Sequence, residues 1–465
     1  MGSKFINIIS TLLFYISILT FIIAFNFAHN PPGGWYQQFL PNIGGRLISD
    51  IFFLDSLNGW TVTSLTQLND TVFVLKTTNG GDKWFISYSR SGELVGMQRI
   101  YFLNEFTGYA CGNGFDNSSQ NNFAKTTNGG FNWFNVNPPD PFEVYHDFSI
   151  FNEDTIWLVS KNSPTGGVFR TTNGGVNWTN QASSGDFPDK IYMYNSRIGF
   201  IGFNAGTPTI KKTTDGGFNW FTVSNEGFTD IEFIDSLTGW KCWNEVDSIK
   251  KTTDGGISWE KQLIPPTGGF FAFSSIVDLA VINANTIWGV GSIATTSLGF
   301  RGLIYKSTNG GDNWGYQLPD TNIIVISRYF NIDFINELNG WAYSNIGRGV
   351  HTVLGGDTTY YPTSVTQISG TTPSDYKLFQ NYPNPFNPLT KIKYELKTPG
   401  FIKLNVYNIN GKEVKTIVNE KQNTGVYEAD FSATEYGSSL SSGVYFYSLF
   451  AGEELVDTKK MIVLK

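Results

Sequence analysis

Apolar and polar residues alternate in short runs along most of the chain, and a glycine-rich turn follows nearly every run. Alternation with a period of two predicts half-buried β-strands, whereas an amphipathic helix needs a period near 3.6. One unit starts at Ile51–Leu54, crosses a polar turn and resumes at Gly59-Trp60; Val74–Thr77 then leads to a second turn that ends at Trp84. The pattern predicts four short strands in each unit of this kind.

Both turns of this unit recur along the chain. The strand–turn–strand element returns at Ile100–Tyr109, Phe148–Trp157, Ile191–Phe200, Ile231–Trp240, Val277–Trp288 and Ile332–Trp341. The second turn, Thr77–Trp84, follows the pattern [ST]-T-[ND]-G-G-x-x-W and returns at Thr126–Trp133, Thr171–Trp178, Thr213–Trp220, Thr252–Trp259 and Ser307–Trp314, with a decayed copy at His351–Asp357. The glycine pairs are 39 to 55 residues apart, a spacing typical of propeller blades. We therefore expect an all-β fold with a seven-bladed β-propeller over residues 30–361.

The start of the propeller complements its end. Gly33-Gly34-Trp35 followed by Tyr36-Gln37-Gln38 looks like the tail of a blade whose head is missing, and the decayed turn at Gly355-Gly356 has no Trp after it. A ring closed with one strand from each end leaves no free sheet edge. The strand after Trp35 is therefore predicted to be the outer strand of the last blade.

The turn pattern T-x-[ND]-x-G-x-x-W resembles the Asp box of sialidase-like (BNR) repeats. The combined pattern I-x-F-x-[DN], G-W and K-T-T-[ND]-G-G-x-x-W is similar to the propellers of the Ycf48/Hcf136 photosystem-assembly type. This resemblance covers roughly residues 35 to 361 and implies a propeller in which the boxes are structural turns away from the working face. It implies no active-site residue, because Asp boxes occur in enzymes and in binding proteins alike.

Charge and cysteine content narrow the function classes. A net charge of −7 and a pI near 5.1 argue against a nucleic-acid partner. Cys111 and Cys242 hold the same position in the second and fifth units, which is too far apart for a disulfide, and we expect them to be buried small residues. The three histidines, His29, His146 and His351, have no ligand spacing, so neither a metal nor a cofactor is predicted.

The N-terminus carries an export signal. Lys4 precedes an apolar run from Phe5 to Phe27, and residues 1–28 are interpreted as a secretory signal peptide. A membrane anchor is the alternative, since the run approaches the length of a span. Any membrane association is expected only through this signal.

The tail differs in composition from the propeller. Residues 362–375 are polar and predict a linker, and residues 376–465 predict a small separate domain. Strands are expected at Lys391–Leu396, Ile402–Tyr407, Glu413–Val418, Tyr427–Phe431, Gly443–Phe450 and Thr458–Leu464, with a hairpin at Asn410-Gly411. Six or so short strands fit an Ig-like β-sandwich.

The opening and the close of this tail resemble the type A C-terminal sorting domain of the type IX secretion system. The motif positions are Asn381, Pro383, Pro385, Phe386, Pro388, Gly443, Tyr445, Lys459 and Lys460. The resemblance implies a Bacteroidota-like source, type IX secretion machinery as a partner, and delivery through the periplasm and outer membrane to the cell surface or medium. An accessory Ig-like domain without a sorting role is the alternative.

Candidate ligand-binding residues lie outside the repeated turns. Carboxylates and amides that recur in most units have the same structural role in each, so no catalytic residue is assigned. The insertions are rich in aromatic residues that can stack on a ligand or pack in the core; the candidates are Phe142, Tyr145, Phe270 and Phe271. Three arginines precede the first strands of their units and are also candidates: Arg46, Arg99 and Arg328.

The function predicted from the sequence is that of an exported, non-catalytic β-propeller scaffold that binds an extracellular protein or glycan. Two alternatives stay open. One is a secreted glycoside hydrolase of the sialidase-like, Asp-box type, which needs two carboxylates across a cleft. The other is a Ycf48-like assembly factor, which suits the repeats but not the export.

Overall fold

The computed structural model describes residues 34–464, apart from 65–69, 93–95, 114–122, 137–144, 161–165, 182–187, 204–206, 244–248, 263, 265–270, 274, 297–298, 320–327, 358, 360–364 and 436–437. The predicted signal peptide, residues 1–28, lies outside this part. The chain divides into two compact units, one formed mainly by residues up to 357 and the other mainly by residues from 358 onward.

Every regular element of the described residues is a β-strand, which confirms the all-β class. None of these residues forms a helix long and apolar enough to cross a bilayer.

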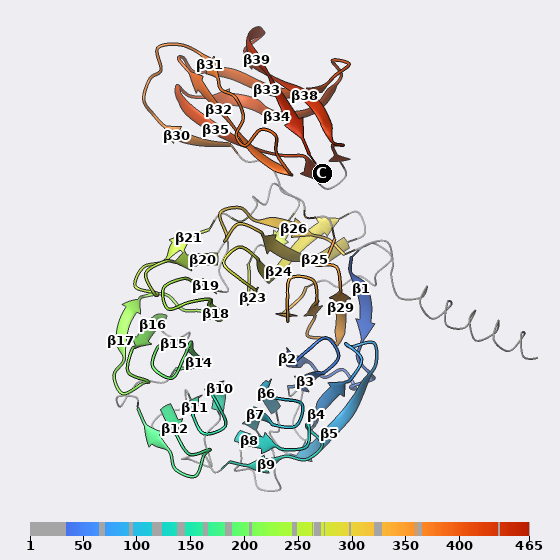
Figure 1. The fold of residues 1–465 in the computed structure, drawn as a ribbon, viewed down its shortest axis with the longest axis vertical. Helices are drawn as coiled ribbons and strands as arrows, with labels where there is room; N and C mark the ends of the chain where they lie inside the picture. Colours follow the sequence, from blue (N-terminus) through green and yellow to red (C-terminus); the bar gives the residue numbers. More distant parts are fainter. Residues whose placement is uncertain are drawn as a thin grey trace, which may run out of the picture. The chain divides into compact units, whose positions relative to one another are not determined.

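The first unit is built from antiparallel sheets arranged in a ring (Figure 1). In the described part of the chain there are seven such sheets, six with four strands and one with five. We call each sheet a blade and number the blades along the chain. Blades 1 to 4 contain β2 (Ile48–Phe53), β3 (Gly59–Thr63), β4 (Asp70–Thr77) and β5 (Trp84–Gly92); β6 (Gly96–Phe102), β7 (Gly108–Asn113), β8 (Phe123–Thr126) and β9 (Phe134–Asn135); β10 (Tyr145–Ile150), β11 (Ile156–Ser160), β12 (Gly167–Thr171) and β13 (Thr179–Asn180); and β14 (Lys190–Met193), β15 (Gly199–Phe203), β16 (Thr209–Thr213) and β17 (Phe221–Ser224).

Blades 5 to 7 complete the ring. They contain β18 (Asp230–Phe233), β19 (Gly239–Cys242), β20 (Ile249–Thr252) and β21 (Glu260–Lys261); β22 (Phe271–Phe273), β23 (Asp278–Val281), β24 (Ile287–Thr296), β25 (Gly299–Ser307) and β26 (Gly315–Gln317); and β27 (Asn331–Phe334), β28 (Gly340–Tyr343), β29 (Arg348–Thr352) and β1 (Tyr36–Phe39). The innermost strands β2, β6, β10, β14, β18, β23 and β27 lie around the axis of the ring (Figure 1). We call the region along this axis, which contains the pocket described below, the channel.

The repeated Asn/Asp-Gly-Gly turns fold as the sequence predicts. In blade 1, Gly80 and Gly81 have φ angles of 70° and 91°, which only glycine adopts without strain. The Thr77 hydroxyl accepts the Gly81 amide at 2.9 Å, and the Asn79 side chain accepts the Lys83 amide at 2.9 Å. These contacts recur in the other boxes, so the boxes are structural turns.

Aromatic rings join neighbouring blades. Phe53 of blade 1 stacks on Trp341 of blade 7 with centroids 3.7 Å apart, and the box residue Trp84 meets Phe53 edge-on at 5.7 Å. Blade 2 repeats the arrangement, with Phe102 stacked on Trp60 at 3.7 Å and met edge-on by Trp133 at 6.1 Å. In these two blades the box Trp thus covers a stacked pair that spans two blades.

Strand β1 closes the ring, which confirms the predicted closure. It pairs antiparallel with β29 in the sheet β1-β29-β28-β27, and Figure 1 shows the two strands side by side. Trp35 is fully buried and meets Phe334 edge-on at 6.1 Å, in the position that a box Trp holds in other blades. A Cβ on Gly34 would lie 1.9 Å from the carbonyl oxygen of Gly356, so the two glycine turns meet where only glycine fits.

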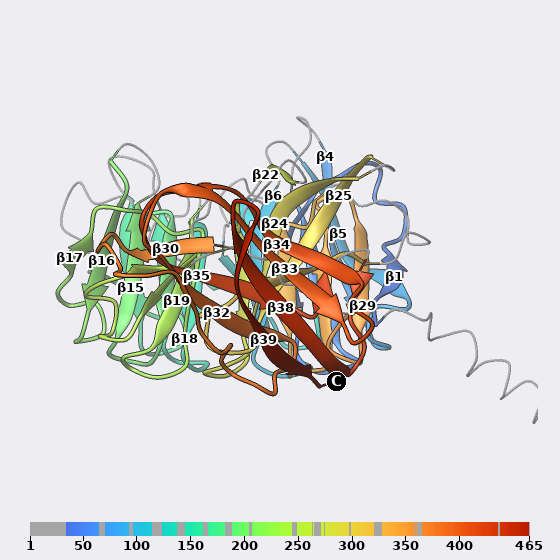
Figure 2. The ribbon, with the colours of Figure 1, turned by 90° about the horizontal axis from the view of Figure 1, so that it is seen from above.

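The C-terminal domain has two four-stranded antiparallel sheets that share one core. The first is β30 (Val365–Ser369), β35 (Gly425–Ser432), β32 (Leu389–Leu396) and β31 (Lys377–Leu378); the second is β34 (Glu413–Gln422), β33 (Gly400–Asn408), β38 (Gly443–Ala451) and β39 (Glu454–Val463); β36 (Thr434–Glu435) and β37 (Ser438–Ser439) form a short ribbon. Figure 2 shows β38 and β39 side by side. In β32, Ile392, Tyr394 and Leu396 alternate into the core, as the sequence predicts.

Part of the predicted linker is a strand. Val365–Ser369 forms β30 and pairs antiparallel with β35. The segment alternates Val, Gln and Ser with Thr and Ile, and β-branched residues favour an extended backbone. The linker prediction for 362–375 is therefore wrong over these five residues.

Replacing Trp35 with alanine should destabilise the propeller by about 3–5 kcal/mol, because a fully buried Trp is lost and the last blade loses its edge-on ring. Thermal unfolding followed by circular dichroism measures the effect. The matched control is Val176→Ala, since Val176 is 77% exposed and its loss should leave the melting temperature nearly unchanged. An unchanged melt for Trp35→Ala, or for a chain lacking residues 30–40, would disprove the closure role.

Candidate functional site

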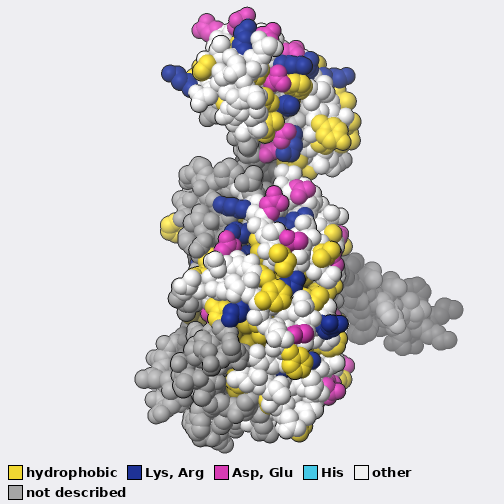
Figure 3. Space-filling model, turned by 90° about the vertical axis from the view of Figure 1, so that its left-hand side faces the viewer, with side chains coloured by type: hydrophobic (Ala, Val, Ile, Leu, Met, Phe, Trp, Pro, Cys, Tyr) yellow, Lys and Arg dark blue, Asp and Glu magenta, His cyan; other side chains and the backbone are white. Residues whose placement is uncertain are grey.

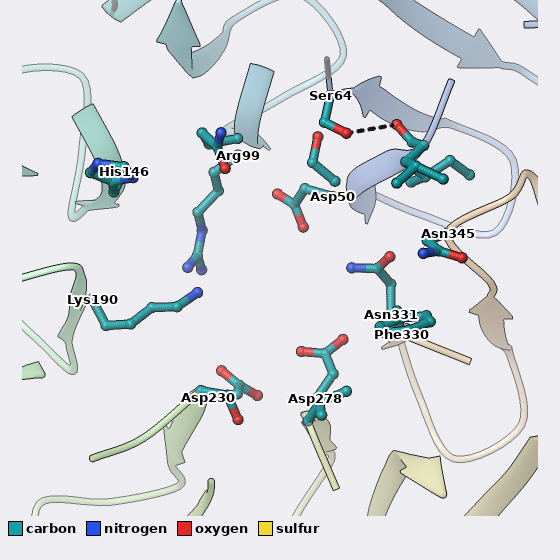
Figure 4. Close-up of a pocket in the computed structure, with 16 residues that line it drawn as sticks. Asp50, Ser64, Arg99, His146, Lys190, Asp230, Asp278, Phe330, Asn331 and Asn345 are labelled. Atoms are coloured by element: carbon teal, nitrogen blue, oxygen red, sulfur yellow. Dashed lines mark hydrogen bonds between the residues drawn. The ribbon is translucent and has the colours of Figure 1, made fainter. Parts of the chain in front are cut away.

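A polar pocket of about 420 Å³ opens at one end of the channel. Every blade contributes to its lining, as Figure 4 shows. Its charged, imidazole and amide side chains come from the innermost strands, apart from Asn345; they are Asp50, Gln98, Arg99, His146, Lys190, Asp230, Asp278, Asn331 and Asn345. The innermost strands begin at this end of the channel. The Asp-box turns lie at the other end: in the first box, the Gly80 amide donates to the carbonyl of Leu57, which follows the end of β2.

The charged lining arises from one repeated strand position. In each blade the innermost strand ends at a residue paired with the first residue of the next strand. The residue three positions earlier lines the pocket in six of the seven blades. We call these seven residues the channel ring: Asp50, Arg99, Asp147, Lys190, Asp230, Asp278 and Asn331. Each innermost strand pairs with a neighbouring strand on one edge only, so the main-chain amides on its channel-facing edge have no strand partner. Polar side chains at this position can accept hydrogen bonds from such amides.

Ring carboxylates accept main-chain amides of the next blade. The Asp50 carboxylate accepts the Ile100 amide at 2.8 Å, and that of Asp278 accepts the Ile332 amide at 2.7 Å. Asp147 and Asp230 accept the amides of Ile191 and Leu279 in the same way, each at 3.0 Å. Four of the seven junctions between blades are bridged by this contact.

A second set of side chains, two positions further along the strands, extends the bridging. Asp333 accepts the Phe53 amide at 2.6 Å and so joins blade 7 to blade 1. Glu232 accepts the Val281 amide at 2.7 Å, and the Tyr192 hydroxyl accepts the Phe233 amide at 3.0 Å. The remaining junction, between blades 2 and 3, is bridged by an ion pair between Arg99 and Asp147 at 2.7 Å.

Burial leaves the channel carboxylates hard to ionise. Burial raises the pKa of Asp50 to about 6 and that of Asp333 to about 7, although the amides of Ile100 and Phe53 favour the charged forms. Burial together with the charge of Asp230 raises the pKa of Asp278 well above its ordinary value. The channel therefore holds more carboxyl groups than cations, and burial favours the protonated form of these groups.

The three arginines predicted to bind a ligand lie in different surroundings. Arg99 lines the pocket. Arg46 instead bonds the Ile43 carbonyl at 2.7 Å and lies over the Phe73 ring, and Arg328 bonds the Ser275 hydroxyl at 3.1 Å and lies over the Phe330 ring. The structure thus does not bring the three arginines together in the pocket.

Two of the four aromatic candidates, Tyr145 and Phe271, lie in the described part of the chain. Tyr145 is fully buried and meets Phe169 edge-on at 6.0 Å, so it packs in the core and offers no stacking face to a ligand. Phe271 begins β22. Phe142 and Phe270 lie outside the described residues.

The other sequence expectations concern buried and turn residues. Cys111 and Cys242 are buried and form no disulfide. Turn carboxylates hold backbone amides: hydrogen bonds from Asn219 keep the pKa of Asp215 at about 2. Such a carboxylate is a poor proton donor, which fits a structural role.

The motif of the C-terminal domain ties its two ends together. Asn381 is buried and donates to the Thr390 hydroxyl at 2.9 Å; Phe386 is buried, and its backbone bonds Ile462 and Leu464 at 3.0 and 2.9 Å. The Lys460 carbonyl accepts bonds from Gln380 and Asn384 at 2.7 and 3.2 Å.

The other motif positions lie around this junction. Pro383 and Pro385 are exposed, Pro388 is half-buried and Gly443 opens β38. Tyr445 is buried and its hydroxyl donates to the Ser441 carbonyl at 3.0 Å, and Lys459 pairs with Asp457 at 2.8 Å.

Residues 380–464 match the family model described as "Secretion system C-terminal sorting domain". The chain ends in a type IX sorting domain. Such a domain implies recognition by the type IX secretion machinery and delivery to the cell surface or medium, so the protein is exported. No curated protein matches the chain.

Solved structures similar to the chain are β-propellers. A structure of YCF48 bound to D1 peptide has 18% identity and a TM-score of 0.51, over 70% of this chain and 98% of that one. YCF48 from Cyanidioschyzon merolae has 17% identity and a TM-score of 0.48, over 69% and 98% of the two chains. The GH74 xyloglucanase of Xanthomonas campestris has 11% identity and a TM-score of 0.47, over 66% of this chain and 43% of that one. At these identities the first likeness shows the fold alone.

The channel ring is not among the sequence-based predictions, although the sequence contains a pattern that reveals it. Six of the seven predicted elements, which begin at Ile51, Ile100 and their equivalents, have the ring residue immediately before their first residue; in the element that begins at Val277, the ring residue Asp278 comes directly after it. A polar residue at this place in every unit is the pattern that reveals the ring.

Replacing Asp333 with Asn should raise the melting temperature at pH 8 by a few degrees, because an amide oxygen still accepts the Phe53 amide and a buried charge is removed. The pKa of Asp333 is about 7 in the folded chain and near 4 when unfolded. The folded wild type therefore holds the extra proton between these values, and its free energy of unfolding falls as pH rises through this window.

Thermal melts from pH 4 to pH 8 test this. The gain should vanish near pH 4, where wild-type Asp333 is protonated, and Asp215→Asn, on an exposed turn, should give no gain at pH 8. A lower melting temperature for Asp333→Asn at pH 8 would contradict the assignment.

Removing the sorting domain should block export. A chain that ends at Asp375 lacks the whole matched region and should stay in the periplasm, whereas the full-length chain should be found outside the cell. Fractionation of the producing bacterium with intact-mass analysis measures both. Retention of both chains in the inner membrane would mean that residues 1–28 act as an anchor.

Proposed function

We propose that the exported propeller is a non-catalytic binding scaffold that presents the channel pocket to a ligand outside the outer membrane. The observation that carries this proposal is the use of the channel carboxylates. Asp50, Asp230 and Asp278 each accept a main-chain amide of the next blade at 2.7–3.0 Å. A carboxylate fixed in this way holds the ring together and is suited to accept hydrogen bonds from a ligand that fits the pocket.

The outer strands support the choice of the pocket over the sides of the blades. Figure 3 shows one side of the molecule, where hydrophobic side chains lie singly or in small groups among polar and charged ones. Charged groups lie among the exposed aromatics: Phe218 is 67% exposed, and the Arg170 guanidinium is 5.4 Å from its ring centroid. A large continuous apolar patch is the usual mark of a protein interface, and the described residues on this side do not present one.

A secreted glycoside hydrolase is the second candidate. The observation that favours it is the pKa of Asp50, which burial raises to about 6 in a pocket that also holds Asp230 and Asp278. A carboxyl group with a raised pKa beside a second carboxylate is the arrangement that glycosidases use as general acid.

Incubating the purified full-length protein with an array of glycans and peptides, followed by chromatography of the soluble products, separates the two candidates. We expect retention of a ligand with no release of sugars. Asp50→Asn keeps an oxygen that accepts the Ile100 amide but removes the second acceptor, so it should weaken ligand binding while the chain stays folded. Sugar release that Asp50→Asn abolishes would replace the scaffold by the hydrolase.

A further inference from the structure

We propose that the channel pocket binds an organic cation, namely the ammonium or guanidinium group of a basic side chain on a protein or peptide. The proposal deepens the scaffold function above and rests on it for its biological setting. It names the chemistry of the ligand that the pocket selects.

The charge of the ring favours a cation. Its seven positions hold four carboxyl groups and two basic side chains, and three of these carboxyl groups and both basic side chains line the pocket. Arg99 is committed to Asp147 at 2.7 Å. The charges of Arg99 and Lys190 both lower the pKa of Asp50 and Asp230, and that of Lys190 lowers the pKa of Asp278. The carboxyl groups still outnumber the cations, so a further cation that enters the pocket would favour their charged forms.

The hydrogen-bonding groups favour a ligand that donates. Asp50 and Asp278 each accept one amide through Oδ2, and Oδ1 remains to accept a further donor. Among the described residues, the Oδ1 atom of Asn331 is buried without a hydrogen-bond partner, and Asn331 lines the pocket. Unfilled acceptors of this kind cost stability unless a donor reaches them, and an ammonium or guanidinium group carries several donors.

Size and spacing favour an organic cation over a metal ion. The pocket of about 420 Å³ lies in the range of sites for small organic groups. The acceptors come from blades 1, 5, 6 and 7, and Figure 4 shows Asp50 on one side with Asp230 and Asp278 on another. In the part of the chain that the structure describes, no three His, Cys, Asp or Glu side chains are arranged to hold a metal.

Lys190 acts as a competitor inside the site. Its charge lowers the pKa of Asp50, Asp230 and Asp278, yet it makes no ion pair with any described residue. Figure 4 shows its amine directed into the pocket. A ligand cation that enters the pocket meets this charge, so removing the charge should strengthen binding while removal of a carboxylate should weaken it.

The test is isothermal titration of the full-length protein at low ionic strength with matched small probes. The cationic probes are Nα-acetyl-lysine amide and Nα-acetyl-arginine amide, with spermidine as a free polyamine; the neutral and acidic controls are Nα-acetyl-norleucine amide and Nα-acetyl-glutamate amide. We expect the two cationic amides to bind and the controls not to bind.

Variants assign the binding to the pocket. Asp278→Asn keeps the oxygen that accepts the Ile332 amide and should weaken cation binding about tenfold. Lys190→Gln should strengthen it several-fold, which an unfolded variant cannot do. Asp215→Asn, a carboxylate on an exposed turn, is the matched control and should change nothing. Thermal melts confirm that each variant is folded.

The cation site is overturned if neither amide binds at about 10 mM, if the acidic probe binds more tightly, or if Asp278→Asn and Lys190→Gln leave the affinity unchanged. A clear preference for spermidine overturns the protein side chain as occupant in favour of a free polyamine of the same chemistry. Sugar release in the array experiment refutes the scaffold without touching the cation site, and loss of cation binding leaves the scaffold standing, so the two proposals fail separately.

Discussion

The innermost strand of every blade presents a row of main-chain amides to the channel, where no further strand can pair with it. Two repeated side-chain positions solve this problem by reaching across to the next blade. Asp50 caps the Ile100 amide, and Asp333 caps the Phe53 amide where the last blade meets the first. The ring therefore closes twice, once at the channel through carboxylates and once at the outside through β1.

This solution sets the electrostatics of the channel. Carboxylates are strong acceptors for amides, but placing several of them around one narrow space costs free energy because like charges repel and water is excluded. The raised pKa values of Asp50 and Asp333, about 6 and about 7, express that cost. Lys190 and the Arg99–Asp147 pair offset part of the charge. The feature that stabilises the blades thus also prepares a site for a positively charged group.

Local patterns in the sequence predicted the local structure well. The Asp-box turns, the closure by Trp35 and the hairpin at Asn410-Gly411 depend on neighbouring residues or on one missing Trp, and each is present in the structure. The channel ring depends on bringing seven distant residues to one axis, and each unit contributes a single ring residue, so no local pattern shows the ring. Strand β30 was missed because its polar composition outweighed its alternation.

In the sorting domain, too, a local sequence motif coincides with residues that fix the local structure. Asn381 and Phe386 are buried, and they hold the opening of the domain against its final strand through bonds to Thr390, Ile462 and Leu464. The motif that makes the tail recognisable is thus largely the set of residues that fixes one edge of the sandwich. Of its neighbours, Tyr382 is 81% exposed and Lys460 is exposed as well. A receptor that reads this domain therefore meets a folded surface at the joined ends of the domain, which the buried motif residues keep in place.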